Sequence, residues 1–314
     1  MIDFTKKSSI KTFYLWIDVM KLMIPIAIIV KLLEGTGAIN YLGELLEPLM
    51  LSVGLPGVLG LVWAVTMLTN LWTGALVFVT LISGMEITSA EATILGIMML
   101  FSHGLPLEIR MAQKCGVSAI FSISLRLGSS IIVAYLFNWI FTSYSILQEP
   151  ANIYILKESL SEPTHFDWIL QQIKSYIIVL AMLLILTLTL DILKKFGLVH
   201  KVGTILSPYF KLMGLSKKCA PITLVGMTLG LVYGGALLLN EVENGELEEE
   251  DLLLSVTSMN LFHSIIEDTI IIFMMGGVIF WILFFRLIYT AIIMNSINKI
   301  IKLRSKLVWG IIRA

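Results

Sequence analysis

Charged residues are scarce in this chain. Only 14% of its 314 residues are Asp, Glu, Lys or Arg, whereas 57% are hydrophobic and the mean hydropathy is +0.92. A soluble domain would be roughly a quarter charged. Several apolar runs reach the roughly 20 residues that a helix needs to cross a bilayer, and they are continuous, which argues against the alternating pattern of a β-barrel. The composition therefore predicts an all-α polytopic protein embedded in a lipid bilayer.

Cysteine is nearly absent, and the sequence motifs of enzymes are missing. Cys115 and Cys219 are too few for a disulfide framework or a thiolate zinc site, so we interpret both as packing residues. No P-loop, nucleophile elbow or zinc-hydrolase motif occurs, so we expect neither an enzyme nor a bound cofactor. The formal net charge is zero, and nothing in the sequence points to nucleic acid. The N-terminal segment has no small-residue cleavage site, so no removable signal peptide is expected.

The sequence repeats after 160 residues. When the two halves are aligned without a gap, residues of distinctive chemistry coincide. The matched pairs include Gly37–Gly197, Gly43–Gly203, Pro48–Pro208, Gly54–Gly214, Gly74–Gly234, Glu86–Glu246, His103–His263, Glu108–Asp268, Gly116–Gly276 and Arg126–Arg286. Glycine, proline, histidine, acid and arginine in one register indicate an internal duplication, and duplications in membrane chains are typical of transporters. We therefore predict a first repeat over 1–143, an external linker over 144–167 and a second repeat over 168–314.

Each repeat is predicted to contain five helical pieces: a span, an interfacial helix, a long apolar piece, an interrupted span and a final span. In the first repeat they cover 12–33, 37–53, 56–83, 88–114 and 117–142, and in the second 168–193, 197–213, 217–241, 249–275 and 277–303. The third piece of the first repeat has 28 residues, which would make a helix of about 42 Å, well over the roughly 30 Å of hydrocarbon. A tilted span is one interpretation, and a re-entrant hairpin with its tip at "TNLWTG" is the other.

The distribution of lysine favours the hairpin. Segment 34–56 carries three glutamates and no Lys or Arg, whereas its counterpart 194–218 carries six lysines and no acid. Equivalent loops with opposite charge bias belong on opposite sides of the membrane, so the repeats are predicted to be inverted, each with an odd number of crossings. Three spans and one re-entrant hairpin per repeat satisfy this rule. Both termini are then cytoplasmic in a multi-pass protein of the cell (inner) membrane.

Three stretches carry a family resemblance: "KLMIPIAIIVKLLEGTGAINYLGELLEPLMLSVGLPG", "MLTNLWTGA" and "MMLFSHGLPLEIRMAQKCG". They resemble the nucleoside-recognition or Gate domain family, which includes spore-maturation-type membrane proteins and a domain of ferrous-iron and concentrative nucleoside transporters. The match is close over 12–130 and looser over 170–300, so the chain looks like two such domains fused. The resemblance implies inverted repeats, re-entrant hairpins and an elevator-like movement. The second copy departs from the pattern, because "HGLPLE" becomes "HSIIED" and Gly230 replaces Asn70.

Two sets of polar residues are predicted near the middle of the membrane. Each histidine lies about 15 residues into its segment, and each arginine lies about 10 residues into the last span, which at 1.5 Å per residue places both near the midplane. An ionised group there costs at least roughly 2.5–3.5 kcal/mol, so each arginine should pair with the acid of its own repeat. The first set is His103, Glu108 and Arg126, and the second is His263, Asp268 and Arg286.

These sets predict a binding site between the repeats. Gly104 and Pro106 would break the helix and free backbone groups, and the hairpin tips, including Gly74, would close over the site. An arginine suits an anionic group, and a histidine beside a carboxylate suits a coupling proton. The structural alternative is that the arginine–acid pairs only clamp neighbouring spans. The predicted substrate- or ion-binding residues are Asn70, Thr73, His103, Glu108, Arg126, Gly234, His263, Asp268 and Arg286.

The function predicted first is secondary transport of a small polar or anionic solute, nucleoside-like or an organic anion. Coupling to a proton or to Na⁺ and assembly into a homo-oligomer stay open. One alternative is a non-transporting scaffold of the spore-maturation type. Another is a divalent metal-ion permease, although His103 and Glu108 are five residues apart, off the i, i+4 spacing of two ligands on one helix. An intramembrane enzyme is the weakest. A polar, solvent-connected pocket would favour transport, and tightly paired dry groups would favour a scaffold.

Overall fold

The protein is a membrane protein whose described part is helical. The computed structural model describes residues 38–82, 84–154, 205–216, 218–231, 248–302 and 312–313, with single residues and short stretches within 10–36, 166–188 and 234–239. Three helical segments are long and apolar enough to cross a membrane: Ser89–Lys114, Ala119–Ser143 and Ile279–Ile301. The predicted pieces 12–33 and 168–193 are described only in part. Residues 197–204 of the predicted piece 197–213, the linker residues 155–165 and residues 241–247 of the acidic run lie outside the described residues.

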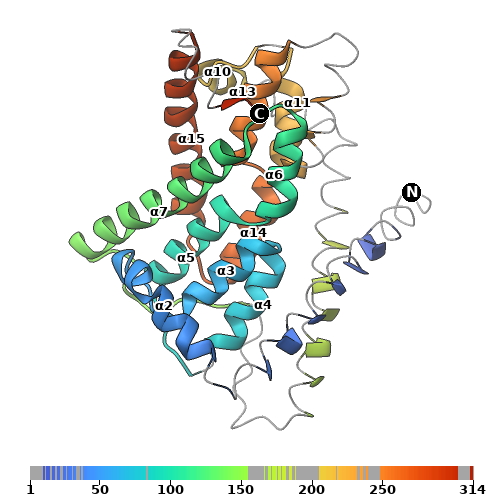
Figure 1. Ribbon diagram of the computed structural model, residues 1–314. Coiled ribbons are helices and arrows are strands. Elements are labelled where there is room, and N and C mark those ends of the chain that lie inside the picture. Colours follow the sequence, from blue (N-terminus) through green and yellow to red (C-terminus); the bar gives the residue numbers. More distant parts are fainter. Residues whose placement is uncertain are drawn as a thin grey trace.

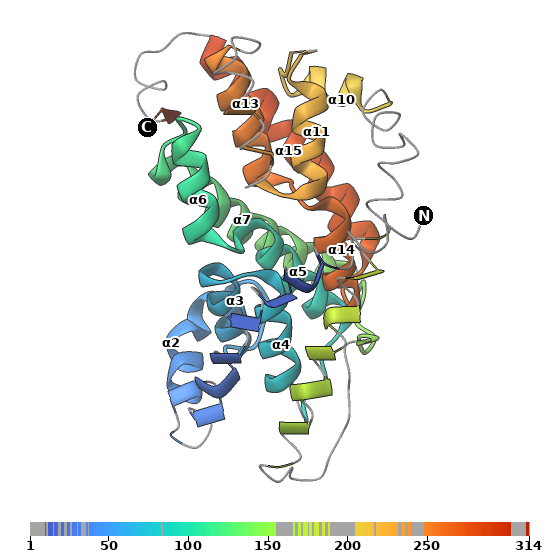
Figure 2. The same ribbon diagram turned by 90° about the vertical axis from the view of Figure 1, so that its right-hand side faces the viewer.

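Eleven helices are described, and they fall into two groups joined at the centre. They are α2 (Ala38–Ser52), α3 (Leu59–Leu68), α4 (Leu71–Leu81), α5 (Ser89–Ser102), α6 (Leu105–Lys114), α7 (Ala119–Ser143), α10 (Ser207–Leu212), α11 (Ala220–Leu229), α13 (Glu249–Leu261), α14 (Ile265–Met274) and α15 (Ile279–Lys302). Helices α2, α3 and α4 gather at one end and α10, α11 and α13 at the other, with α5, α7 and α14 between them (Figures 1 and 2).

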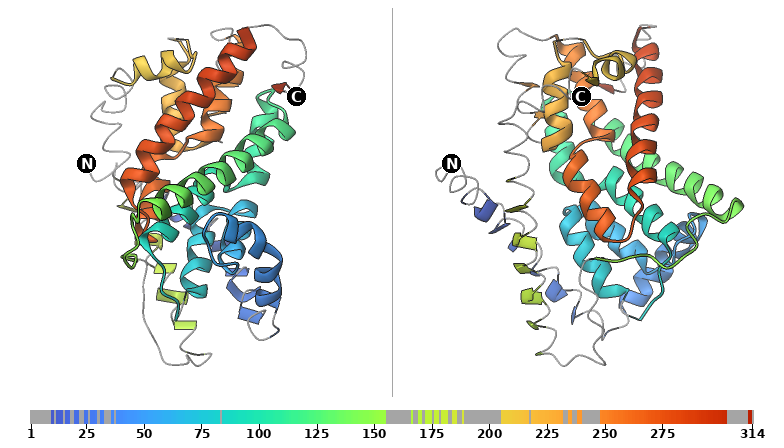
Figure 3. Two further views of the ribbon diagram at one scale, coloured as in Figure 1. Left: turned by 90° about the vertical axis from the view of Figure 1, so that its left-hand side faces the viewer. Right: turned by 180° about the vertical axis from the view of Figure 1, so that it is seen from behind.

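Helix α5 lies in the buried core between the two groups. Every residue of α5 except Glu91 is buried, which suits a sequence that is apolar on all sides. Thr88 and Glu91 form a capping box that fixes the start of α5. The longest helices, α7 and α15, run along one side of the molecule (Figure 3) and bury only part of their surface, which leaves an apolar face for lipid.

The segment 56–83 is a helical hairpin, which excludes the single tilted helix. Helix α3 ends at Thr69, and the extended Asn70 caps α4 by accepting hydrogen bonds from Thr73 N at 2.9 Å and Thr73 Oγ1 at 3.1 Å. At 10 and 11 residues, each arm is about 15 Å long, half of what a span requires. The arms pack together closely, because a Cβ on Gly74 would lie 1.8 Å from Thr66 Oγ1.

The equivalent segment of the second half shows the same break. Helix α11 ends at Gly230, whose φ of +100° interrupts the helix, and helical residues resume at Leu231. A Cβ on Gly234 would lie 2.3 Å from the Cα of Gly226, so these two turns also approach as closely as glycine allows. Residues 232–233 and 236–237 lie outside the described part of the chain.

The segment 88–114 is interrupted where the sequence predicts. Helix α5 ends at His103, Gly104 adopts the left-handed conformation at φ +60°, and Pro106 falls in the first turn of α6. Glycine enters this region without strain, and proline fits the first turn because its missing N–H would have no helical partner there. In the second half Ser264 takes the same conformation, at φ +48°, between α13 and α14.

Several packing contacts recur 160 residues apart. Gly54 and Gly214 both have positive φ, and an added Cβ would meet the side chain of Asn138 at 2.2 Å in one case and of Asn298 at 2.1 Å in the other. Residues 160 apart also contact each other directly. The pairs are Trp16 Nε1 with Tyr176 O at 2.9 Å, Tyr289 OH with Ser129 Oγ at 3.0 Å, and the Nε2 atoms of His103 and His263 at 3.0 Å.

Candidate functional site

Six predicted polar residues meet in one buried cluster, which we call the central cluster. Each half of the chain supplies three of these residues: one histidine at a helix break, one acid in the first turn of the following helix, and one arginine on a long helix. None exposes more than 8% of its surface. The central cluster consists of His103, Glu108, Arg126, His263, Asp268 and Arg286.

The two histidines face each other at the centre of this cluster. Their Nε2 atoms lie 3.0 Å apart and their ring centroids 4.8 Å apart. On the opposite edge of each ring, Nδ1 contacts the backbone oxygen four residues earlier: Met99 O at 3.2 Å for His103 and Met259 O at 2.6 Å for His263. A carbonyl oxygen only accepts hydrogen bonds, so both Nδ1 atoms carry the hydrogen. In the neutral rings both Nε2 atoms are therefore acceptors.

The predicted pair between Arg126 and Glu108 is present. Arg126 Nη1 donates to Glu108 Oε2, while Nε donates to Phe101 O and Nη2 to His103 O, both at 2.7 Å. Those two carbonyls lie at the end of α5, where the helix can no longer supply donors. The fully buried guanidinium therefore binds both the carboxylate and the broken end of the helix.

The predicted pair between Arg286 and Asp268 is not formed, which corrects the expectation of two mirrored sets. Arg286 donates to Leu261 O at 3.0 Å and Leu100 O at 3.2 Å, and its guanidinium lies 5.0 Å from the centroid of the Phe262 ring. In the described part of the chain, no hydrogen-bond partner reaches Arg286 Nη1 or Asp268 Oδ2. Aspartate is one methylene shorter than glutamate, so it does not repeat the reach of Glu108.

Each carboxylate instead faces the histidine of the opposite half, and Glu108 also faces the histidine of its own half. Glu108 Oε1 lies 3.0 Å from His263 Nε2 and 3.5 Å from His103 Nε2, and Asp268 Oδ2 lies 3.6 Å from His103 Nε2. The sequence spacing of five between His103 and Glu108 is bridged because the helix breaks between them. The acids thus join the two halves across the cluster.

The hairpin tips lie against the helix breaks, but the polar side chains of the first tip form hydrogen bonds with each other. Gly104 N donates to Thr66 O at 3.0 Å, and a Cβ on Gly230 would lie 3.2 Å from Ser264 Oγ. Asn70 and Thr73 bind each other at the helix start. Their predicted contact with a solute stays a prediction, as does that of Gly234.

Further polar contacts between the halves were not predicted. Trp72 Nε1, beside the first hairpin tip, donates to Glu267 Oε1 at 2.9 Å. Asn260 Nδ2 donates to Ser122 Oγ at 3.1 Å, between α13 and α7. The signal for both was a polar residue inside an apolar run, as in "SIIEDT" and "SVTSMNLF".

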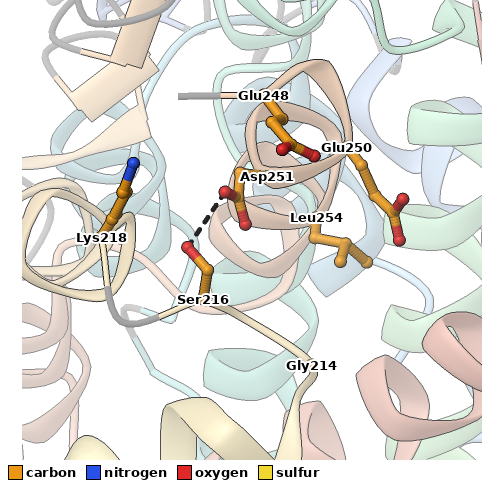
Figure 4. Close-up of a pocket in the computed structure, with 7 residues that line it drawn as sticks. All are labelled: Gly214, Ser216, Lys218, Glu248, Glu250, Asp251 and Leu254. Carbon is orange, nitrogen blue, oxygen red and sulfur yellow. Dashed lines mark hydrogen bonds between the residues drawn. The ribbon is translucent and has the colours of Figure 1, made fainter. Parts of the chain in front are cut away.

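A pocket of about 410 Å³ lies at the far end of α13 (Figure 4). Ser216 Oγ donates to Asp251 Oδ2 there at 3.0 Å. From Asp251 to His263 the chain advances 12 residues, or about 18 Å of helix, so this pocket is separate from the central cluster. The lining residues are Gly214, Ser216, Lys218, Glu248, Glu250, Asp251 and Leu254.

The chain is similar to the uncharacterized membrane protein YvoD of Bacillus subtilis (strain 168). The two are 25% identical over 280 residues, which is 88% of this chain and 87% of that protein. No family model matches the chain, and no solved structure matches it. The relative and the long apolar helices agree that this is a membrane protein, whereas the resemblance to the Gate family gains no support from a family model.

Proposed function

We propose that the protein is a secondary transporter of a small polar or anionic solute, nucleoside-like or an organic anion, with the central cluster as its site. The observation that carries this proposal is that Asp268 Oδ2 and Arg286 Nη1 are buried without a hydrogen-bond partner among the described residues. A buried unsatisfied donor or acceptor costs about 1–3 kcal/mol. A solute with a hydrogen-bond donor for Asp268 Oδ2 and an acceptor, neutral or anionic, for Arg286 Nη1 would satisfy both atoms, whereas a purely structural clamp is expected to pair them.

The broken helices support a site at this position. Transporters place interrupted helices near the middle of the membrane, where freed backbone groups meet solute or ion. Irregular backbone is tolerated at that depth only inside protein or along a cavity. Both breaks, at His103 and at His263, lie in the central cluster. The cluster is occluded, so in this proposal the solute enters when the two groups of helices move apart.

For the architecture, we propose two inverted repeats over 1–143 and 168–314, linked outside the membrane by 144–167. Each would contribute three spans, an interfacial helix and a re-entrant hairpin. Residues in equivalent positions of two repeats can touch only near the axis that relates them. The three contacts between residues 160 apart, and the two matched hairpin breaks, support such an axis through the central cluster.

The proposed topology has six spans with both termini in the cytoplasm. Pieces 56–83 and 217–241 enter and leave on the side they came from. Three backbone contacts join segments that this topology puts on one side: Thr88 with Pro150 and Tyr154 with Met274 outside, and Val117 with Arg313 inside.

Cysteine labelling tests the topology. In a chain whose two native cysteines are replaced by alanine, Pro56→Cys and Gly84→Cys should both react with an impermeant maleimide added outside. Lys114→Cys and Lys218→Cys should react only after the membrane is opened. Labelling of Pro56→Cys and Gly84→Cys from opposite sides would make the hairpin a true span and contradict the six-span topology.

A non-transporting scaffold is the second candidate, and the Arg126 contacts favour it. That side chain satisfies a carboxylate and two helix-end carbonyls at once, which is the arrangement of a structural clamp. In this case the central cluster would hold the two halves together and bind no solute.

Uptake into proteoliposomes separates the two candidates. We expect the purified protein to accumulate at least one solute from a panel of labelled nucleosides, mono- and dicarboxylates, faster under an imposed proton or Na⁺ gradient. Gly128→Ala is a control, because nothing lies within 4 Å of the added Cβ, and it should keep uptake. A panel in which no solute enters faster than into empty liposomes would favour the scaffold.

A further inference from the structure

The polar atoms that converge at the centre of the cluster are all acceptors. His103 Nε2 lies 3.0 Å from His263 Nε2, 3.5 Å from Glu108 Oε1 and 3.6 Å from Asp268 Oδ2, and His263 Nε2 lies 3.0 Å from Glu108 Oε1. Because both Nδ1 atoms hold the hydrogen for a backbone carbonyl, the neutral rings offer only lone pairs here. Lone pairs that face one another repel, so a cation among these atoms would stabilise this geometry.

We propose that these four atoms bind one divalent transition-metal ion of the Zn²⁺ class. Bonds of about 2.0–2.1 Å in a tetrahedral site separate neighbouring ligand atoms by about 3.3 Å, and four of the six separations among these atoms span 3.0–3.6 Å. His103, His263 and Asp268 each offer a ligand atom within 4.8 Å of the other two. Two imidazole nitrogens select a transition metal over Mg²⁺ or Ca²⁺, which prefer oxygen ligands.

The surroundings of the four atoms fit a cation. A metal-binding histidine usually donates its other ring N–H to a carbonyl or carboxylate, which fixes the ring, and Met99 O and Met259 O fill that role. The C-terminal ends of α5 and α13 converge on the cluster, and helix C-termini favour positive charge. The N-termini of α6 and α14 also face the cluster and disfavour a cation. The carboxylates of Glu108 and Asp268 in their first turns offset this effect.

This inference deepens the transport proposal and rests on it, because transport supplies the route by which the ion reaches the buried site. The ionised side chains of Glu108, Asp268, Arg126 and Arg286 sum to zero charge, so a divalent ion would leave a buried excess of positive charge. An anion carried with the ion would offset that excess, and the unpaired Arg286 Nη1 is a donor for it. The solute class is then an anion with oxygen ligands, bound beside the metal.

Zinc titration of the full-length protein in detergent tests the site. After removal of metal with a chelator, we expect calorimetry and elemental analysis to give one Zn²⁺ per chain, with nitrogen and oxygen neighbours by X-ray absorption, and no binding of Mg²⁺. His103→Gln and His263→Gln should each lose the bound Zn²⁺. Ser129→Ala, which removes the hydroxyl bonded to Tyr289, should keep it, as should replacement of the remaining histidines, His165 and His200, by Gln.

Thermal melting keeps the test valid if a variant folds poorly. Zn²⁺ should raise the melting temperature of the wild type and of Ser129→Ala but leave the two cluster variants unchanged. Zn²⁺ bound equally by wild type and His103→Gln/His263→Gln would overturn the proposal. So would failure of the wild type to bind Zn²⁺ when ¹⁵N spectra show a proton shared by the histidine pair. Solute uptake without Zn²⁺ binding refutes only the metal site, and Zn²⁺ binding without any uptake refutes only the transport proposal.

Discussion

Arg126→Ala should destabilise the protein by about 3–5 kcal/mol, because it leaves Glu108 buried without its partner. It also removes the donors to Phe101 O and His103 O at the end of α5. Arg126→Ala/Glu108→Ala should recover part of that loss, since the uncompensated charge is gone while the two carbonyls stay unsatisfied. Reversible unfolding in mixed micelles measures the free energy of each variant.

The second half provides a matched control for this cycle. Arg286→Ala and Asp268→Ala remove residues that share no ion pair in the described structure. Their cycle should show a smaller coupling energy than the cycle of Arg126 with Glu108, for which about 1–3 kcal/mol is expected. Equal destabilisation by Arg126→Ala and by Arg126→Ala/Glu108→Ala would show that these two residues do not act as partners.

Asp268→Asn should abolish solute uptake and cost less stability than Arg126→Ala. The Asp268 carboxylate is buried and its Oδ2 atom has no hydrogen-bond partner within the described residues, so the substitution breaks no hydrogen bond at that atom. The same change removes a ligand from the proposed site. Uptake into proteoliposomes and unfolding in micelles are measured on one preparation.

Thr290→Val controls for the removal of an unpaired buried group. Thr290 Oγ1 is also buried without a partner in the described structure, but the residue is no member of the central cluster. This variant should be as stable as the wild type or more so, and it should keep uptake. If Asp268→Asn were destabilised as much as Arg126→Ala and still transported, Asp268 would be a structural residue and the proposed site would be wrong.

Much of the local structure follows from the sequence. Glycine at 104 and proline at 106 interrupt the helix because one favours the left-handed conformation and the other has no N–H. Asn70 marks the restart of a helix, since its side chain caps free N–H groups. Continuous apolar runs with few charges specify membrane helices. These features depend on neighbouring residues, which the sequence shows directly.

Local sequence patterns do not predict which side chains pair inside the central cluster. The register of 160 residues predicted Arg126 with Glu108 and Arg286 with Asp268, and only the first pair is present. The polar residue Glu267 is visible inside its apolar run, but its partner Trp72 lies 195 residues away and could not be predicted. Each of these contacts depends on the length of one side chain and on how two distant helices pack.

The class of protein, the helix breaks and the residue types at the centre could all be predicted from local sequence patterns. The merging of two His–acid–Arg sets into one cluster, with the histidines in contact and Asp268 and Arg286 unpaired, becomes visible only in the folded chain. Hydropathy and turn chemistry act over a few residues, whereas packing between helices about 160 residues apart selects the partner of a buried charge.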